Sequence, residues 1–198
     1  MSRCVNNMRQ IGTGVLMYSE DNGGAFPRNR FDKRPATRTW KHAVAKYVRS
    51  MDVYICPSNI GYFSPLPGAT PMDESGEFPR SYAYNGCIFH KGAALPEEQL
   101  RKLSDIRMPT RTIYILESRS EFPDLGCWSL VYDKSQGFLA GYYSEGKGRI
   151  QTHTGRLSNW LMCDMHVSSM SVAQTCVPNN MWGSYIYPPG SVPWSSQA

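Results

Sequence analysis

Four polar residues in the last third of the chain have the types and the spacing of a metal-binding group: His153, Asn159, Asp164 and His166. Asp164 and His166 lie two residues apart, so a strand can place both side chains on one face, and His153 can approach across a hairpin. A structural interpretation competes with this one. Asp164 can make a turn by accepting nearby backbone N–H groups while His166 bonds a neighbour, and this is the interpretation we favour.

Carboxylates elsewhere in the chain raise a second metal hypothesis. Calcium requires several oxygen ligands close together. The candidates are Asp124, Asp133, Glu145 and Asp164, and they do not follow the spacing of an EF-hand loop. We favour the interpretation that they are ordinary surface carboxylates, so we expect no cofactor, with calcium as the alternative.

Nucleophilic catalysis has little support. The sequence contains no Gly-x-Ser-x-Gly elbow, no P-loop and no His-Glu-x-x-His helix. Cys163 lies three residues before His166, but an odd spacing places two side chains on opposite faces of a continuous strand. We expect Cys163 to be structural and the chain not to be an enzyme.

The cysteines also leave their chemistry open. There is no Cys-x-x-Cys pair, which removes the main support for a zinc ribbon or a thioredoxin-like site. An even number is compatible with up to three disulfides in an oxidising compartment, in any of fifteen connectivities. Small buried thiols are the alternative. The six residues are Cys4, Cys56, Cys87, Cys127, Cys163 and Cys176.

The composition is that of one folded domain. The 198 residues are 41% hydrophobic and 19% charged, and 17 Gly and 14 Pro predict many turns and long loops. The formal charge of +5 comes from scattered Lys and Arg residues, so we expect no nucleic-acid partner. No run approaches the roughly eighteen apolar residues that span a bilayer.

Periodicity predicts the elements that position these residues. Residues 3–20 predict a helix, because apolar residues recur every three or four positions, and the run 22–24 (Asn-Gly-Gly) ends it. The stripe of this helix consists of Cys4, Met8, Ile11, Val15 and Tyr18. Further predictions are a helix over 38–49, a short helix over 96–102, strands over 53–56, 81–85, 112–117 and 128–132, and a hairpin of 158–163 with 166–172 around a tight turn at Asp164-Met165. Loops are expected over 57–80 and 134–156. The order predicts an α+β fold, in which an N-terminal helix packs on an antiparallel sheet of about four or five strands.

Four blocks, in order, resemble a known family. The first contains Cys4, Asn6, Asn7, Gln10, Gly12, Tyr18, Asp21, Asn22, Phe26 and Pro27; the second Cys56 and Pro57; the third Ser81, Tyr82, Tyr84 and Asn85; and the fourth His153, Gly155, Asn159, Asp164, His166 and Val167. Together they span about residues 4–170. They resemble bacterial type IV pilin-like and type II secretion pseudopilin-like proteins that carry a prepilin-type N-terminal methylation signal.

The resemblance implies a pilin-like fold and a structural, non-catalytic role in a type II secretion or type IV pilus-like filament. Its partners would be copies of itself, other pilin-like subunits and the inner-membrane assembly machinery. The protein would be extracytoplasmic, periplasmic or on the cell surface, and membrane-anchored only through an apolar helix. We interpret the chain as truncated within that helix. Residues 1–24 would be its C-terminal part, 25–177 the head, and 178–198 a tail rich in Pro, Gly and aromatic residues, in one domain overall.

Two details refine this interpretation. The helix stripe would face neighbouring subunits at Cys4 and Met8, and the head at Val15 and Tyr18. The family has glycine after the aspartate of its last block, whereas this chain has Met165. A non-glycine residue with positive φ costs about 1 kcal/mol there, unless the turn has another geometry.

Two other functions stay open. Exposed aromatic side chains at Trp128, Trp182, Tyr185 and Tyr187 would make the protein an extracytoplasmic module that binds carbohydrate or protein. The polar residues of the last third would make it a metal-dependent hydrolase.

Overall fold

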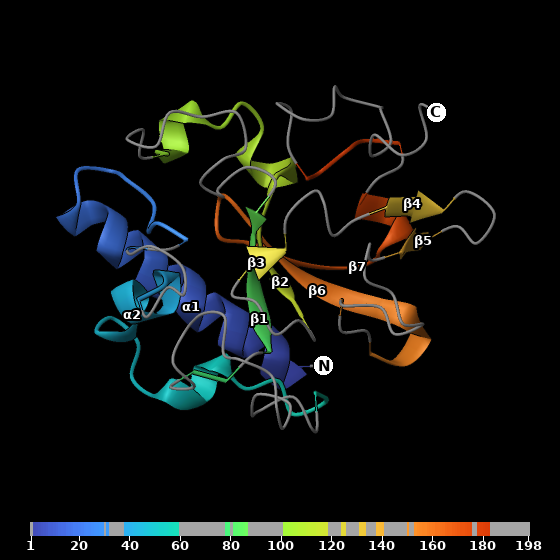
Figure 1. Ribbon diagram of the computed structural model, residues 1–198, viewed down its shortest axis with the longest axis horizontal. Helices are drawn as coiled ribbons and strands as arrows, with labels where there is room; N and C mark the ends of the chain where they lie inside the picture. The colour runs from blue at the N-terminus through green and yellow to red at the C-terminus, as the bar shows by residue number, and fades with distance from the viewer. Residues whose placement is uncertain are drawn as a thin grey trace.

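The computed structural model describes residues 2–29, 31, 38–59, 78–79, 81–86, 101–118, 124–125, 150, 153–175 and 178–182, and the backbone alone of 131–133 and 138–140. Within these ranges the fold is α+β, as expected. An N-terminal helix and a second, shorter helix lie at one side of a five-stranded sheet (Figure 1). The expected loops over 57–80 and 134–156 fall mostly outside the described residues. So do most of the predicted helix over 96–102 and residues 128–130 of one predicted strand.

The sheet is mixed, which corrects the expectation of an antiparallel one. Its order is β3-β1-β2-β6-β7, and β1 with β2, β2 with β6, and β6 with β7 are antiparallel pairs. The edge strand β3 runs parallel to β1 through two residue pairs. A parallel neighbour needs a crossover connection, which strand propensity does not reveal. The strands are β1 (Tyr82–Asn85), β2 (Ile113–Glu117), β3 (Asp124–Leu125), β6 (Leu157–Met162) and β7 (Val167–Ser171), with a separate antiparallel pair of β4 (Val131–Asp133) and β5 (Phe138–Ala140).

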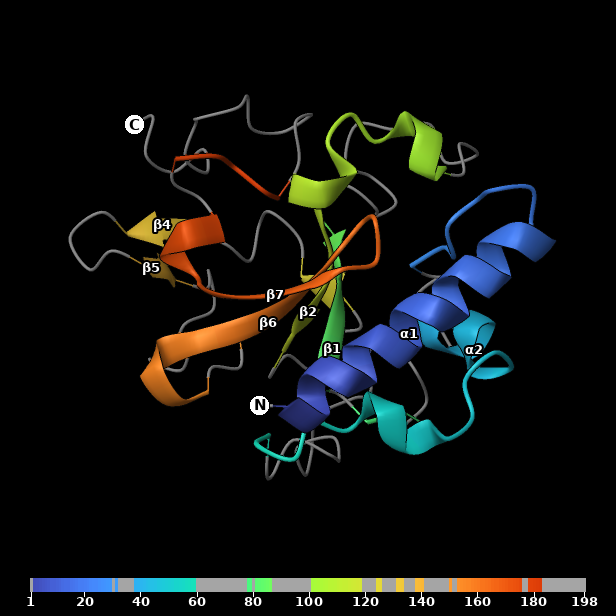
Figure 2. The same ribbon diagram turned by 180° about the vertical axis from the view of Figure 1, so that it is seen from behind.

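The first helix, α1 (Ser2–Asp21), confirms the helix predicted over 3–20. Its end follows from two glycines with left-handed backbone, Gly23 with φ of 64° and Gly24 with φ of 83°. The Gly24 N–H donates to the Ser19 carbonyl at 2.8 Å. Seen from behind, α1 runs along the sheet, with the β4–β5 pair at the other side of the molecule (Figure 2).

Two local predictions were wrong in extent or type. The helix expected over 38–49 is only α2 (Trp40–Ala45). The strand expected over 53–56 does not form: residues 53 and 54 end a 3₁₀ turn, η1 (Met51–Tyr54), which the Ser50 side chain caps by accepting the Asp52 N–H at 3.1 Å. Further 3₁₀ turns are η2 (Leu103–Asp105), η3 (Pro109–Arg111), η5 (Thr154–Arg156) and η6 (Ala173–Thr175).

The hairpin of β6 and β7 forms as predicted, with a different turn. The Met165 N–H donates to the Met162 carbonyl at 2.9 Å, and Met162 N–H donates to the His166 carbonyl at 2.9 Å. Met165 has φ of 68°. The loop therefore holds three residues, a turn followed by one residue in the left-handed region, rather than a two-residue turn. A methionine takes the backbone conformation for which glycine is the usual choice.

The sheet separates two cores. The helix-side core contains the inner stripe of α1, Trp40, Tyr54, Tyr82, Tyr84 and Tyr114, whereas the far-side core contains Ala83, Leu116, Trp160 and Trp182. Cys4 and Met8 were expected to face neighbouring subunits, but they are 1% and 0% exposed inside the helix-side core. Tyr18, expected to face the head, is half-buried, and its ring packs edge-on against Tyr47. Both faces are covered at β1 and β2, whose residues are all buried, whereas the edge strand β7 is only partly buried.

None of the helices in the described ranges has the length and the apolar character needed to cross a membrane.

Candidate functional site

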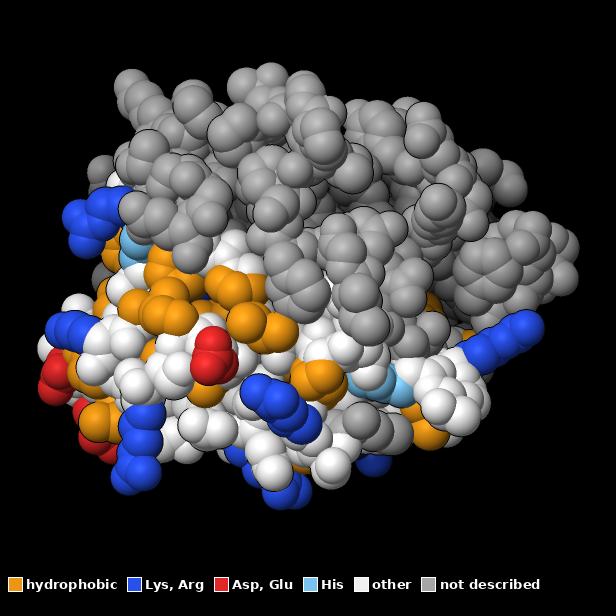
Figure 3. Space-filling model, turned by 90° about the horizontal axis from the view of Figure 1, so that it is seen from below, with side chains coloured by type: hydrophobic (Ala, Val, Ile, Leu, Met, Phe, Trp, Pro, Cys, Tyr) orange, Lys and Arg blue, Asp and Glu red, His pale blue; other side chains and the backbone are white. Residues whose placement is uncertain are grey.

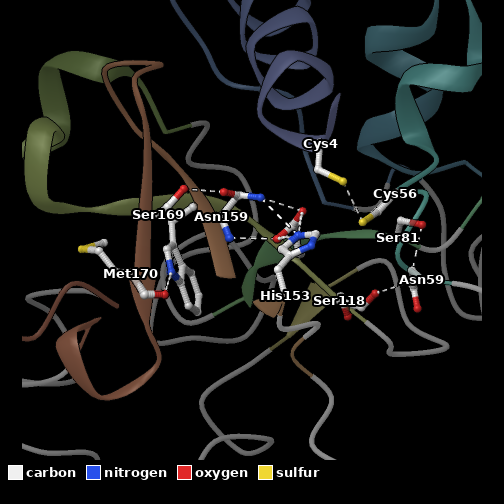
Figure 4. A network of polar contacts seen from close by, with 11 residues as sticks. Cys4, Cys56, Asn59, Ser81, Ser118, His153, Asn159, Ser169 and Met170 are labelled. Atoms are coloured by element: carbon white, nitrogen blue, oxygen red, sulfur yellow. Dashed lines mark hydrogen bonds and ion pairs between the residues drawn. The ribbon is translucent and has the colours of Figure 1, made fainter. Parts of the chain in front are cut away.

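Four side chains from distant parts of the chain converge at the N-terminal end of α1: Cys4, Cys56, Glu117 and His153. One ligand atom of each lies within 4.8 Å of the other three. Cys4 comes from the first turn of α1, Cys56 follows η1, Glu117 ends β2 and His153 precedes η5 (Figure 4). Among the residues whose side chains the structure describes, no other set of three or more His, Cys, Asp or Glu residues is arranged in this way.

Glu117 is the centre of a closed hydrogen-bond network. Its carboxylate is fully buried, and each of its two oxygens lies 2.9 Å from His153 Nε2. Asn159, opposite in β6, donates its backbone N–H to Oε2 at 2.8 Å and its side-chain Nδ2 to Oε1 at 3.0 Å. The Ser169 hydroxyl in β7 donates to Asn159 Oδ1 at 2.5 Å and fixes the amide orientation. Each carboxylate oxygen therefore faces two nitrogens, which is what a buried charge requires.

The two cysteines form a close pair beside this network. Their sulfurs lie 2.9 Å apart and both side chains are buried. The hydrogen bond from Cys56 lowers the pKa of the Cys4 thiol, while the same bond, together with burial, raises the pKa of Cys56. The negative charge of Glu117 opposes ionisation of either thiol. Ionisation of both thiols at once is therefore disfavoured.

The residues of the less favoured metal hypothesis, His153, Asp164 and His166, do not come together. His153 belongs to the Glu117 network, whereas Asp164 and His166 bond each other at the hairpin turn, Nδ1 to Oδ1 at 2.6 Å. Asp164 Oδ1 also accepts the His166 backbone N–H, and His166 Nε2 contacts the Ser168 hydroxyl at 3.1 Å. This is the turn-making role that we favoured from the sequence. It also occupies both ring nitrogens of His166, so Cys163 has no imidazole partner there.

The other candidate residues are spread through the fold. Asp124 is buried in β3 rather than at the surface, Asp164 lies at the hairpin, Asp133 lies in β4, and Glu145 lies outside the described residues. Cys163 is buried, its N–H donates to the Thr112 carbonyl, and burial raises the pKa of its thiol. Trp182, expected to be exposed, is 1% exposed and donates its indole N–H to Thr175 Oγ1 at 3.0 Å. Trp128, Tyr185 and Tyr187 lie outside the described residues, as do Cys87, Cys127 and Cys176.

Several motif residues make internal bonds between distant segments. Asn7 donates to the Ile55 carbonyl at 2.8 Å, and the Tyr84 hydroxyl donates to the Pro27 carbonyl at 2.5 Å. The Asn85 side chain donates to the carbonyls of Ile113 at 2.7 Å and Trp182 at 3.0 Å. These side chains hold distant backbone segments together, so their role here is structural.

Sequence reasoning named Cys4, Cys56 and His153 as motif residues but did not connect them, and it missed Glu117 entirely. The available signal was a carboxylate at the end of the apolar run Ile113–Glu117, where the strand is buried throughout. A buried carboxylate needs donors. That requirement could have directed attention to the histidine and asparagine of the last block.

Comparison with family models, with curated proteins and with solved structures finds no match to this chain.

Proposed function

We propose that this chain is the head of a pilin-like structural subunit of a bacterial type II secretion or type IV pilus-like filament, with no catalytic role. The observation that carries the proposal is the packing of α1. Cys4, Met8, Ile11 and Val15, four residues along about three turns of one face, are all buried against the head. A helix held in this way transmits a pull along its axis to the sheet, as a filament subunit requires.

The motif residues support the same function. Asn7, Tyr84, Asn85 and Asn159 bond backbone or buried groups within the chain, and His153 contacts the buried Glu117, which is not a motif residue. Such side chains stabilise one rigid shape. A substrate site, by contrast, usually leaves some polar groups open to a cavity.

The outer face of α1 offers the contact surface that an assembled subunit needs. Leu16 is 40% exposed and Met17 is 45% exposed, so two consecutive large apolar side chains are available there to a partner subunit. On the described part of the face seen from below, hydrophobic side chains lie among Lys and Arg side chains that are separated from one another (Figure 3). This pattern suits contact with protein subunits better than contact with a phosphate backbone. In the cell, we place the head on the extracytoplasmic side, anchored by an apolar helix continuous with α1.

Photo-crosslinking tests this function. The protein is expressed in its bacterial host with a photoreactive amino acid in place of Met17. A second variant carries it in place of Leu103, which has similar exposure on another part of the head and serves as the control. We expect a ladder of self-crosslinked species from Met17 that disappears when the assembly ATPase is deleted. A crosslinker at Met17 that captures no copy of the chain, in cells that make the protein at a normal level, would contradict the filament role.

A further inference from the structure

We propose that Cys4 and Cys56 are joined by a disulfide that ties the first turn of α1 to the segment after η1. This inference does not depend on the filament role, because it concerns a covalent bond within the head. Neither cysteine's partner could be chosen from the sequence, where six cysteines allow fifteen connectivities.

The surrounding backbone already holds the two sulfurs in place. Asn7, one turn along α1 from Cys4, donates its side-chain N–H to the carbonyl of Ile55, the residue before Cys56. This bond joins the same two segments as the thiol pair. The sulfurs are 2.9 Å apart and both residues are 1% exposed or less. They therefore meet in a fixed arrangement from which only a small movement is needed to form a bond of about 2.05 Å.

A metal ion is the competing occupant, and the network of Glu117 disfavours it. Two thiolates on one tetrahedral zinc, each at about 2.3 Å, lie about 3.8 Å apart, so the pair would have to separate. Glu117 has both oxygens facing nitrogens of His153 and Asn159. A metal would have to displace His153 Nε2 from the carboxylate that it contacts.

Electrostatics favour the same outcome. Glu117 is a fully buried carboxylate next to the two thiols, and a thiolate beside it would place a second negative charge in the core. A disulfide is neutral at every pH. It removes the ionisable protons from the cluster and leaves the Glu117–His153–Asn159 network unchanged.

The bond forms by exchange with a low-molecular-weight disulfide. The Cys4 thiolate attacks one sulfur of that disulfide and releases one small thiolate, which gives a mixed disulfide on Cys4. Cys56, as its thiolate, then attacks Cys4 Sγ and releases the second small thiolate. The two cysteines lose two protons and two electrons, and the small disulfide is reduced to two thiols. Because both sulfurs are buried in the folded head, the exchange takes place before α1 docks.

Peptide mapping tests the proposal. The chain is isolated from its natural host without reductant, with iodoacetamide present from lysis, and is denatured and digested with trypsin. Cleavage after Arg3, Arg9, Arg49 and Arg80 places Cys4 in residues 4–9 and Cys56 in residues 50–80, each as the sole cysteine of its peptide. We expect these two peptides to be linked, and the linkage to be lost on reduction. In the Cys4→Ser variant, we expect Cys56 to be recovered alkylated.

Three results would overturn the proposal. Cys4 and Cys56 both alkylated, with about one zinc per chain by elemental analysis of the unreduced protein, would make the cluster a metal centre. Both alkylated without a metal would make them buried free thiols. A peptide linking either cysteine to Cys87, Cys127, Cys163 or Cys176 would assign a different connectivity.

Discussion

Gly14 in α1 and Val44 in α2 approach so closely that a methyl group on Gly14 would lie 2.8 Å from Val44 Cγ1. The same methyl group would meet Val48 Cγ1 at 3.0 Å. Carbon atoms in good contact lie about 3.5–4.0 Å apart, so the second helix packs against a position that only glycine can fill. This contact fixes how near α2 lies to α1.

Gly14→Ala should therefore destabilise the head, although alanine favours helix by about 1 kcal/mol over glycine. Overpacking costs about 1–3 kcal/mol, and we expect a net loss of about 1 kcal/mol in the free energy of unfolding by urea. Thr13→Ala, at the exposed neighbouring position, is the control and should change stability by less than about 0.5 kcal/mol. Equal effects from the two substitutions would mean that α1 and α2 do not pack as described.

Glu117→Gln should lower the free energy of unfolding by about 3 kcal/mol, because an amide turns one of its own N–H groups toward the donors of Asn159 and His153. Equilibrium unfolding in urea measures the change. The exposed Glu20→Gln is the matched control and should shift stability by less than about 0.5 kcal/mol. A Glu117→Gln protein as stable as the parent would show that the carboxylate charge is not needed by the network.

Reduction should also destabilise the head if Cys4 and Cys56 are joined. The bond closes a loop with a sequence separation of 52 residues, for which the chain-entropy relation gives about 4 kcal/mol. Urea unfolding with and without dithiothreitol measures this difference. The Cys4→Ser variant should show no reductant effect of that size, and an unchanged effect in this variant would assign the sensitivity to other cysteines.

Stability should fall above about pH 10, the ordinary pKa of tyrosine. Burial raises the pKa of Tyr84 and of Tyr114 well above that value, with the folded state retaining protons that the unfolded state releases. The stabilisation is complete below the unfolded pKa and decreases as pH rises, by up to about 1.4 kcal/mol per pH unit for each tyrosine.

Tyr84→Phe tests this dependence. Urea unfolding between pH 9 and pH 11 should give a slope smaller by up to about 1.4 kcal/mol per pH unit than that of the parent. The comparison uses slopes because loss of the bond from Tyr84 to the Pro27 carbonyl lowers stability at every pH. Identical slopes would mean that Tyr84 ionises in the folded state as readily as in the unfolded one.

The local elements were predictable where the signal lies within a few residues. The stripe of α1 follows from a helical periodicity, and the two strands around Asp164 and Met165 were predicted from strand-like runs on either side of a tight turn; both were found. Propensity failed over 53–56, because the side chain of Ser50 selects a turn for residues that favour a strand. Hydrophobic pattern gives the type of an element but little about its neighbours.

The candidate site was less predictable because its contacts are long-range. Cys4 and Cys56 are 52 positions apart, and Glu117 and His153 are 36 apart. Their meeting depends on how α1 crosses the sheet and on the order of β1, β2 and β6, neither of which a spacing rule contains. For the same reason, the sequence suggested Asp164 and His166 as possible neighbours of His153, whereas its partner in the fold is Glu117. Residues close in sequence were the candidates, but the contact is made by a residue far away in sequence.

The far-side core includes Trp182, and two bonds fix the segment around it: Asn85 donates to the Trp182 carbonyl, and the Ile113 N–H donates to the Met181 carbonyl at 2.9 Å. Among the described residues, those of the helix-side core end at Val167. During synthesis these residues leave the ribosome before Trp182, so the described part of the helix-side core is available before the far-side core has its last described member. A nascent chain at that stage would expose the apolar face of the sheet that Trp182 covers, and this is the stage at which a chaperone would be needed.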